Sequence, residues 1–469
     1  MKPKKSNIGR PFTIVFTAVA IVFGLSFVPW SKISGGVIKD FNLLASLSND
    51  TTKQVASNEL IDPELLEAYS SIIDSVQAPK IDTVAKPSPQ PRGGQSAPTL
   101  PSEPRNVAAE PTRVNGSVVF EDYTPGKQGL ANLKSALASG QARVAIIGDS
   151  YIEGDIYAKD IRNQLQGAWG GRGVGFMPAD SPVKGFRGTV KHTSSGWKQV
   201  KSSSSPYFPL MGEHYVGSNG ARLSYKGVKD DKLSSWNRSQ VLFVAPTSGS
   251  ITITTDTGEQ TFDIEASEDV QEITIPYTTT SFELVNRVPG LIYLGAYLDD
   301  TYGVAVDCMS VRGDSGITHR FINTSLASKM RRYIDYDLII VEYGINALTS
   351  EQKNYDHYSK LMQQVIERLK EAYPRADIVM MGIGDRGVKV NGSVQSIPTA
   401  PAMVSAQRHA AQQGGVIFWD TREAMGGEGA VVDWRKRSLI NGDYIHLNMA
   451  GGKQLADLFV KSLNQKLSE

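Results

Sequence analysis

Short apolar runs alternate with amphipathic stretches in two parts of the chain. The apolar runs predict buried strands at Arg143–Ile147, Val304–Cys308, Leu338–Glu342, Ile378–Met381 and Val416–Trp419. The amphipathic stretches predict helices near Ala158–Leu165, Ser359–Ala372, Met403–Gln413 and Ala450–Leu463. Strands that are apolar throughout and alternate with helices indicate a parallel sheet that is covered on both faces.

Between these two parts, from about Ser181 to Gly290, the pattern changes to alternation with a period of two. This pattern predicts strands at Gln240–Val244, Ser250–Thr254, Gln260–Ile264, Glu272–Pro276 and Phe282–Val285. Short strands with frequent turns and no good helix indicate a β-sandwich or jelly roll. We therefore expect a β-rich domain that interrupts an α/β domain between its first and later strands.

A glycine-rich stretch, from Gly167 to Gly175, lies just before the β-rich segment. It follows a predicted helix rather than a strand, which argues against a nucleotide-binding loop. The remaining interpretations are a flexible border of a functional site and a junction between domains.

The N-terminal segment predicts export. An uncharged run from Phe12 to Trp30 follows Lys2, Lys4, Lys5 and Arg10. At ~1.5 Å per residue this run spans close to the ~30 Å of a bilayer core, and the preceding basic residues place its N-terminal end in the cytoplasm. The run is longer than the usual apolar core of a signal peptide, and Gly24-Leu25-Ser26 is a poor cleavage site, so an uncleaved anchor in the inner membrane is favoured over a removed signal peptide. Either one places the rest of the chain outside the cytoplasm, and we expect a periplasmic protein.

The chain thus divides into an anchor or signal segment (1–31), a connecting region (32–117), and an α/β domain in two parts. Within the connecting region, Asp62-Pro63-Glu64 is a good helix start, and residues 78–114 form a proline-rich linker. The two parts of the α/β domain are 118–180 and 303–469, with the β-rich insert at 181–302 between them.

Composition excludes several classes of function. The formal net charge of +1 gives no support for nucleic-acid binding, which requires a basic surplus. A single cysteine, Cys308, cannot form an intramolecular disulfide or a cysteine-rich metal site. No group of His, Asp and Glu has convincing metal-ligand spacing, so neither a metal nor another cofactor is expected.

Residues with hydrolytic chemistry lie at both ends of the α/β pattern. Ser150 follows the first predicted strand, and Asp443 precedes His446 by three residues, just ahead of the last helix. A serine hydroxyl needs a base to take its proton as it attacks, and an imidazole oriented by a carboxylate is such a base. Side chains at i and i+3 on a helix share a face, so Asp443 can reach the imidazole of His446.

The same chemistry needs hydrogen-bond donors for the negative charge that develops on the substrate oxygen. Three candidates follow predicted strands: the backbone N–H of Ser150, the backbone N–H of Gly313 and the side-chain amide of Asn346. Gly316 is an alternative to Gly313. Because sites in parallel sheets form at the carboxyl ends of the strands, we expect these groups to converge.

Four sequence blocks in this order resemble the SGNH/GDSL hydrolase superfamily. They are Gly148-Asp149-Ser150, Val311-Arg312-Gly313, Gly344-Ile345-Asn346-Ala347 and Asp443-Tyr444-Ile445-His446. In the third block Ala347 replaces an aspartate that is not catalytic. The resemblance implies a flavodoxin-like, three-layer hydrolase domain, with Ser150, Asp443 and His446 as the catalytic triad.

Within this superfamily the chain looks like periplasmic peptidoglycan O-acetylesterases and related polysaccharide O-acetyl esterases or transferases. The similarity includes the inserted β-rich domain, which in those relatives resembles a carbohydrate-binding module. The resemblance implies an acetylated glycan as substrate. Arg312, Asp385 and Arg386 are candidates for lining the sugar site. An O-acetyltransferase with the same triad and a non-catalytic glycan-binding protein remain as alternatives.

Overall fold

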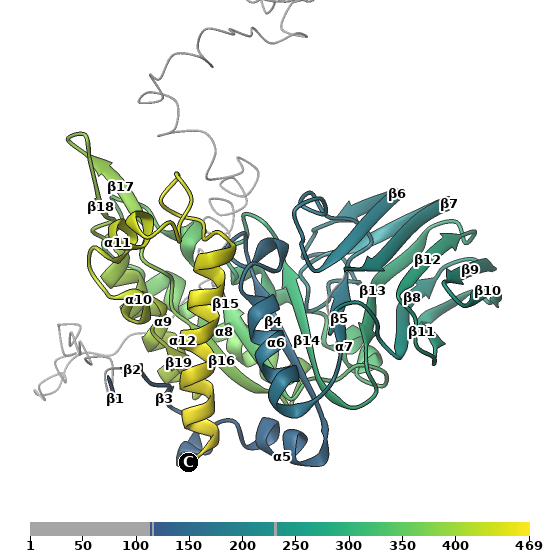
Figure 1. The fold of residues 1–469 in the computed structure, drawn as a ribbon, viewed down its shortest axis with the longest axis horizontal. Coiled ribbons are helices and arrows are strands. Elements are labelled where there is room, and N and C mark those ends of the chain that lie inside the picture. The colour runs from purple at the N-terminus through teal and green to yellow at the C-terminus, as the bar shows by residue number, and fades with distance from the viewer. Residues whose placement is uncertain (1–112, 115–116, 229–231) are drawn as a thin grey trace, which may run out of the picture. The chain divides into compact units, whose positions relative to one another are not determined.

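The computed structural model describes residues 113–114, 117–228 and 232–469 (Figure 1). The membrane segment predicted at 12–30, the helix predicted after Asp62 and almost all of the proline-rich linker lie outside the described residues. Within the described part of the chain, no helix is both long and apolar enough to cross a membrane.

The α/β part forms a mixed sheet with parallel central strands. In the described residues its order is β14-β4-β15-β16-β19-β3. The parallel strands are β4 (Gln141–Gly148), β14 (Gly303–Ser310), β15 (Leu338–Glu342), β16 (Asp377–Met381) and β19 (Ile417–Trp419), and β3 (Glu121–Asp122) pairs antiparallel with β19. Numbered along the chain, the parallel strands lie in the order 2-1-3-4-5, which is flavodoxin-like.

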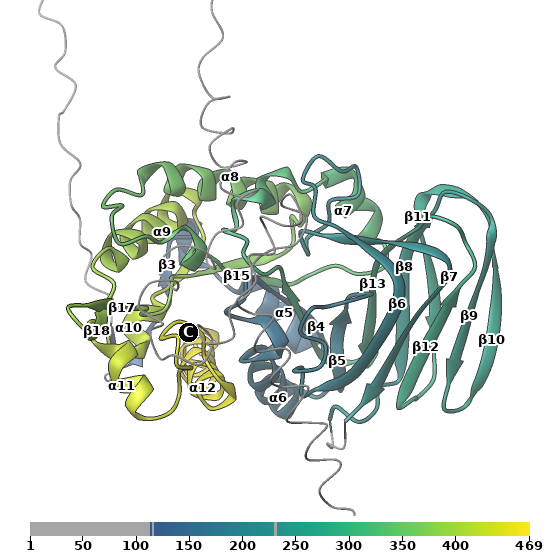
Figure 2. The ribbon, with the colours of Figure 1, turned by 90° about the horizontal axis from the view of Figure 1, so that it is seen from above.

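Helices cover both faces of this sheet (Figure 2). On one face α6 (Ala158–Trp169) packs against α12 (Met449–Leu467), and on the other α8 (Asp356–Ala372) packs against α9 (Ala400–Gly414). The shorter helices are α5 (Ala131–Ser139), α7 (Thr324–Met330), α10 (Thr421–Met425) and α11 (Ala430–Lys436). The predicted three-layer α/β arrangement is confirmed.

Alternate strand residues and one face of α12 supply the main core of this domain. Val144 and Ile146 of β4 are fully buried in the same cluster as Leu455 and Phe459 of α12. The Phe459 ring lies 5.2 Å from the Trp419 ring, centroid to centroid. Burying these side chains contributes roughly 1.5–3 kcal/mol each. The packing fixes the last helix, and therefore the loop that precedes it, against the sheet.

The β-rich segment forms a second, antiparallel sheet. In the described residues the order is β10-β9-β12-β7-β13-β8-β11, with β5 paired to β13 and β6 paired to β7. The strands are β5 (Gly173–Met177), β6 (Val190–Val200), β7 (His214–Gly227), β8 (Arg238–Ala245), β9 (Gly249–Thr255), β10 (Gly258–Ile264), β11 (Ser267–Ile275), β12 (Ser281–Asn286) and β13 (Leu291–Asp299). Hydrogen bonds join all of them into one branched sheet, so the expected β-sandwich is not confirmed.

The glycine-rich stretch ends in β5, a buried strand at the junction of the two sheets. β5 pairs with β13 of the antiparallel sheet and packs against β14 of the parallel sheet. Gly173 and Gly175 have positive φ angles of 91° and 69°, and a Cβ on either would clash with the carbonyl of Leu298 or of Val306. Of the two interpretations, a domain junction fits this strand and a flexible border does not.

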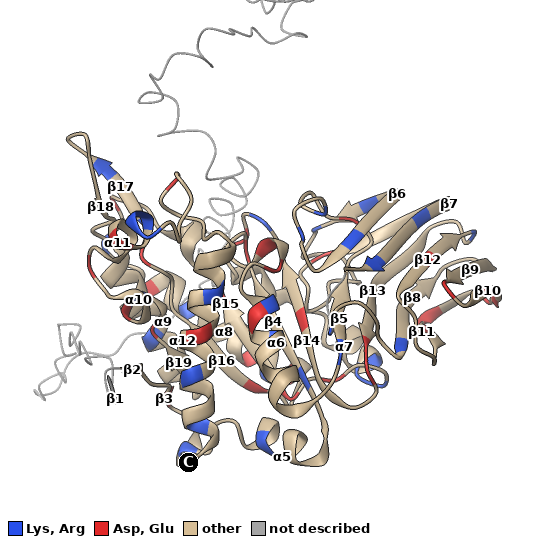
Figure 3. Cartoon of the chain, viewed as in Figure 1, with Lys and Arg blue, Asp and Glu red and all other residues tan. Residues whose placement is uncertain are grey.

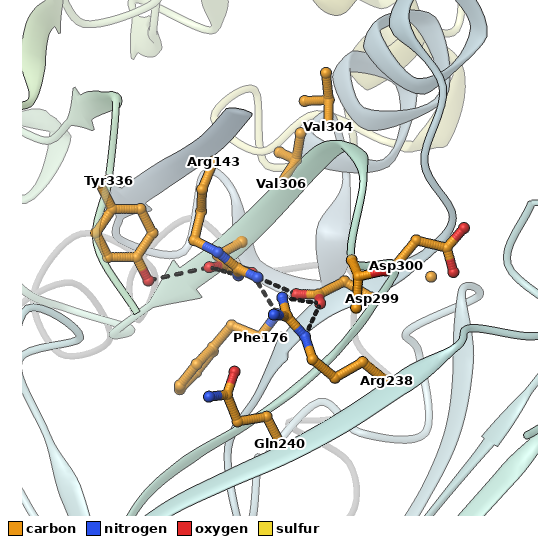
Figure 4. Close-up of polar contacts among 12 residues, drawn as sticks. Arg143, Phe176, Arg238, Gln240, Asp299, Asp300, Val304, Val306 and Tyr336 are labelled. Atoms are coloured by element: carbon orange, nitrogen blue, oxygen red, sulfur yellow. Dashed lines mark hydrogen bonds and ion pairs between the residues drawn. The ribbon is translucent and has the colours of Figure 1, made fainter. Parts of the chain in front are cut away.

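Buried ion pairs join the two sheets at the same place (Figure 4). The Arg143 guanidinium on β4 donates to the carboxylates of Asp307 on β14, at 2.7 Å, and of Asp299 on β13. Arg238 on β8 also donates to Asp299, at 2.7 Å. Asp307 further accepts the Phe176 N–H, at 2.8 Å, and the Tyr336 hydroxyl, at 3.0 Å. Such a satisfied buried network holds the sheets in one relative orientation.

Candidate active site

Ser150 lies in the turn directly after β4, at the carboxyl edge of the parallel sheet. The strand must end in a glycine here, because a Cβ on Gly148 would lie 2.6 Å from the Glu342 carbonyl oxygen on β15. The side chain of Ser150 is largely buried, and its Oγ lies 3.0 Å from Nε2 of His446. A serine hydroxyl and an imidazole almost three hundred residues apart in sequence are thus within hydrogen-bonding distance.

Asp443 orients the His446 ring from its other side. The Asp443 Oδ2 lies 2.7 Å from His446 Nδ1, and Asp443 Oδ1 accepts the N–H groups of Ile445 and His446. Burial alone would raise the pKa of Asp443, but the hydrogen bonds from His446 and Ile445 lower it below its usual value. An ionised Asp443 keeps the proton on Nδ1, so the Nε2 lone pair faces the serine.

The backbone around this pair differs from the expected helical turn. Residues 441–447 form a tight loop that the Asn441 N–H closes by donating to the His446 carbonyl, at 2.8 Å, and Tyr444 has a φ of 59°. The i, i+3 contact therefore comes from a loop rather than from a helix face. α12 begins at Met449, and a Cβ on Gly452 would clash with the Ile156 carbonyl. This close approach holds the loop beside the segment that follows Ser150.

Two backbone N–H groups are available to a substrate oxygen. Within the described residues, neither the Ser150 N–H nor the Gly313 N–H donates to another group. The N–H of Gly316 instead donates to Asp314 Oδ1, at 2.7 Å. Of the two glycines that the sequence left open, this geometry favours Gly313.

Asn346 is differently placed from the expectation. Its side-chain Nδ2 donates to Asp149 Oδ2, at 2.8 Å, and to the Asp314 carbonyl, at 2.9 Å. The two bonds fix the amide beside the turn that carries Ser150. Donation to a substrate oxygen would require one of them to weaken, so the oxyanion role of Asn346 stays a prediction.

Asp149 and Glu342 form a buried carboxyl pair behind Ser150 that the sequence analysis missed. Asp149 accepts the Tyr151 N–H, at 2.9 Å, as well as the Asn346 amide. Burial raises the pKa of Asp149 to about 7, with the Tyr151 N–H acting in the opposite direction. Burial and the Asp149 carboxylate raise the pKa of Glu342 well above its usual value, and its Oε2 has no partner in the described part of the chain. The signal in the sequence was an acid that ends an otherwise apolar strand.

Glu342→Gln is expected to make the protein more stable at alkaline pH. The folded state keeps a proton on Glu342 that the unfolded chain releases above about pH 4.5, so the free energy of unfolding falls with rising pH by up to ~1.4 kcal/mol per unit. Glu342→Gln carries no such proton, so its free energy of unfolding does not fall with pH for this reason. Its stability advantage over wild type should grow with pH, by up to ~1.4 kcal/mol per unit between pH 5 and pH 8 in urea unfolding.

The matched control is Glu371→Gln, which changes an exposed acid on α8. Its difference from wild type should not change with pH. A constant difference between Glu342→Gln and wild type over this range would contradict the buried, protonated state of Glu342.

The three candidates for the sugar site have different surroundings. Arg312 is exposed and pairs with Glu153. Arg386 is largely covered, and its Nη1 donates to the carbonyls of Ile345 and Leu348, which flank the Asn346 segment. Asp385 is buried, and it accepts hydrogen bonds from Ser396, Arg422 and the Val431 N–H. Asp385 is therefore held by protein partners and Arg312 is open to a ligand, while Arg386 keeps an Nε donor that has no partner in the described residues.

Comparison with known proteins agrees with an α/β hydrolase fold. Residues 286–454 match the GDSL-like Lipase/Acylhydrolase family. The structure is similar to that of a peptidoglycan O-acetylesterase, with 20% identity and a TM-score of 0.62, over 74% of this chain and 99% of that one. A family two carbohydrate esterase from Cellvibrio japonicus is 13% identical, with a TM-score of 0.27, over 59% of this chain and 99% of that one. No curated protein matches the chain.

Proposed function

Because the chain carries a domain of the GDSL-like Lipase/Acylhydrolase family and is a serine hydrolase of the SGNH type, we propose that it is an exported esterase that removes O-acetyl groups from a cell-wall or other polysaccharide. The observation that carries the proposal is the hydrogen-bonded series Ser150–His446–Asp443 at the carboxyl edge of the parallel sheet. The fold shared with a peptidoglycan O-acetylesterase supports an acetylated glycan as the substrate.

The first half of the reaction transfers the acetyl group to the enzyme. Ser150 Oγ attacks the acetyl carbonyl carbon while His446 Nε2 takes the hydroxyl proton, and the ionised Asp443 stabilises the imidazolium. The negative charge on the former carbonyl oxygen is placed at the N–H groups of Ser150 and Gly313. When the C–O bond to the sugar breaks, His446 returns the proton to the leaving sugar oxygen, and acetyl-Ser150 remains.

The second half releases acetate. Water attacks acetyl-Ser150 with His446 as the base, and the serine leaves with the proton from the imidazolium. The Asp443 carboxylate and part of the His446 ring are open to solvent. Water can therefore reach the acyl-enzyme, and a sugar hydroxyl in its place would make the protein an O-acetyltransferase.

Acetate release from polysaccharides tests the proposal. The purified full-length chain should release acetate from O-acetylated peptidoglycan or from O-acetylated xylan, measured with an enzyme-coupled acetate assay. Ser150→Ala protein should release none above background. Hydrolysis of a small ester without acetate release from any acetylated polysaccharide would contradict the proposed substrate class. Accumulation of acetylated sugar on an added glycan acceptor would instead identify a transferase.

Export and membrane anchoring are part of the same proposal, and the segment 12–30 supports them. In intact cells whose outer layer has been opened, added protease should degrade the protein while cytoplasmic markers survive. The protein should remain with the membrane fraction at high salt. Protection from the protease would contradict export, and complete release by salt would contradict an uncleaved anchor.

A further inference from the structure

A cavity of about 50 Å³ lies between the segment that follows Ser150 and the antiparallel sheet. The hydrolase side contributes Glu153 and Arg312, and the antiparallel side contributes Lys184, Lys201 and Glu213. Glu153 is three residues beyond Ser150, and Arg312 directly precedes Gly313. The cavity therefore borders the two segments that carry Ser150 and Gly313.

The cavity contains both cations and acids. Three of its cationic side chains reach solvent, with exposed fractions of 55% for Arg312, 46% for Lys201 and 33% for Lys184, while Arg187 is 10% exposed and pairs with Asp155. The acids that lie next to the first two are covered, with 7% for Glu153 and 3% for Glu213. Figure 3 marks further basic positions on β6 and β7 of the antiparallel sheet. Arg312 and Lys201 thus lie nearer the solvent than the acids beside them, while Asp180, which is 42% exposed, accepts a hydrogen bond from Lys184.

The two acids hold the cations in place without using all of their donors. Glu153 accepts a hydrogen bond from one terminal nitrogen of Arg312. The other guanidinium N–H groups remain free to bind a ligand. Lys201 Nζ lies 4.0 Å from Glu213, whose carboxylate already accepts the Tyr215 hydroxyl, at 2.5 Å, and the Gln199 amide, at 2.7 Å. Asp180, which is half-exposed, is engaged with Lys184 and Ser194. Outward donors on Arg312 and Lys201 fit a carboxylate.

An exposed aromatic ring stands at the rim. Phe186 has an exposed fraction of 78% and lies in the loop between Lys184 and Arg187, both of which line the cavity. A single exposed apolar residue is ordinary on a protein surface. Beside a polar cavity, however, its flat face suits the apolar face of a sugar ring.

We propose that this cavity binds a carboxylate-bearing sugar unit next to the acetylated one, with Arg312 and Lys201 on the carboxylate and Phe186 against the ring. The inference rests on the proposed function and narrows its substrate to acidic acetylated glycans. Two sources share this chemistry: uronic acids, and muramic acid with its lactyl group. The tests below separate them.

Binding is measured by calorimetry with the full-length Ser150→Ala chain, which lacks the nucleophile and therefore leaves the probes intact. The probes are trigalacturonate and its methyl ester, and the disaccharide of N-acetylglucosamine and N-acetylmuramic acid and its amide. At least one acid should bind about 30-fold more tightly than its neutral form, as expected for two charge-assisted contacts. The pair of probes with the larger difference in affinity identifies uronic acid or muramic acid as the source of the carboxylate. Added salt should reduce the preference for the acid over its neutral form.

Variants then assign the contacts. Arg312→Gln should reduce the preference for the acid about 10-fold, and Lys201→Gln should reduce it about 3-fold, since its charge is more exposed. Phe186→Ala should weaken the binding of the acid and of its neutral form by the same factor. The matched control is Lys198→Gln, which removes the same charge from an exposed position on β6, outside the cavity. It should leave both affinities within about twofold of the parent.

Equal affinity for every acid and its neutral form would overturn the inference. An equal loss in Lys198→Gln and Lys201→Gln would overturn it too, because the effect would then be one of net charge. These outcomes are separate from failure of the proposed function, which acetate release by the wild-type chain decides.

Discussion

Replacing Ser150 with alanine is expected to lower kcat for ester hydrolysis by about 10⁴-fold or more. The Ser150 Oγ is the nucleophilic atom 3.0 Å from His446 Nε2, and alanine leaves only binding and the backbone donors to act on the ester. His446→Ala should cost a similar factor, because the serine then has no base. Initial rates with 4-nitrophenyl acetate measure both variants.

A double variant, Ser150→Ala with His446→Ala, distinguishes the loss of a shared catalytic unit from a loss of activity caused by misfolding. Residues that act as one unit lose their joint contribution when either is removed, so Ser150→Ala combined with His446→Ala should be no slower than Ser150→Ala alone. His409→Ala serves as the control, because His409 lies on α9 away from the triad. Near-normal turnover by Ser150→Ala protein with an unchanged circular dichroism spectrum would exclude Ser150 as the nucleophile.

Arg143→Met is expected to lower the free energy of unfolding by about 3–5 kcal/mol, the cost of leaving buried charges without a partner. Methionine fills much of the volume but leaves Asp307 with only neutral donors, the Phe176 N–H and the Tyr336 hydroxyl. Asp299 keeps Arg238. The expected loss therefore comes mainly from Asp307, and urea unfolding at neutral pH measures it.

A second substitution shows whether the loss comes from charge. Asp307→Asn in the Arg143→Met background removes the stranded charge and should recover part of the stability. Arg375→Met is the control, because the Arg375 side chain is 70% exposed and lies 3.6 Å from Asp337, so its loss should cost less than about 1 kcal/mol. Equal losses for Arg143→Met and Arg375→Met would contradict a structural role for the buried network.

The parallel sheet and the convergence at its edge could be predicted from the sequence because both follow from local patterns. Apolar runs such as Leu338–Glu342 predict buried strands, and the carboxyl ends of parallel strands lie at one edge. Ser150, Gly313 and Asn346 each follow such a strand. The order of the four blocks along the chain therefore indicated a common site.

The antiparallel sheet could be predicted only in part, because its pairings join residues that are far apart in sequence. β6 and β7 carry many exposed polar residues, and Gly196 and Gly220 interrupt their alternation, so neither was predicted as a strand. The partners of Asn346 could not be predicted for a similar reason. Its amide meets Asp149 from a different block, and a sequence pattern does not specify which of two nearby groups a side chain selects.

The pairing of β5 with β13 bears on how such proteins can be recombined. Exchange of the β-rich segment between homologues would ordinarily cut the chain near residues 181 and 302. A cut there leaves Gly173–Met177 in the recipient, where the donor's β13 must recreate its pairing. The exchangeable cassette should therefore start before Gly173, and Asp299 should travel with it only if Arg143 is present in the recipient.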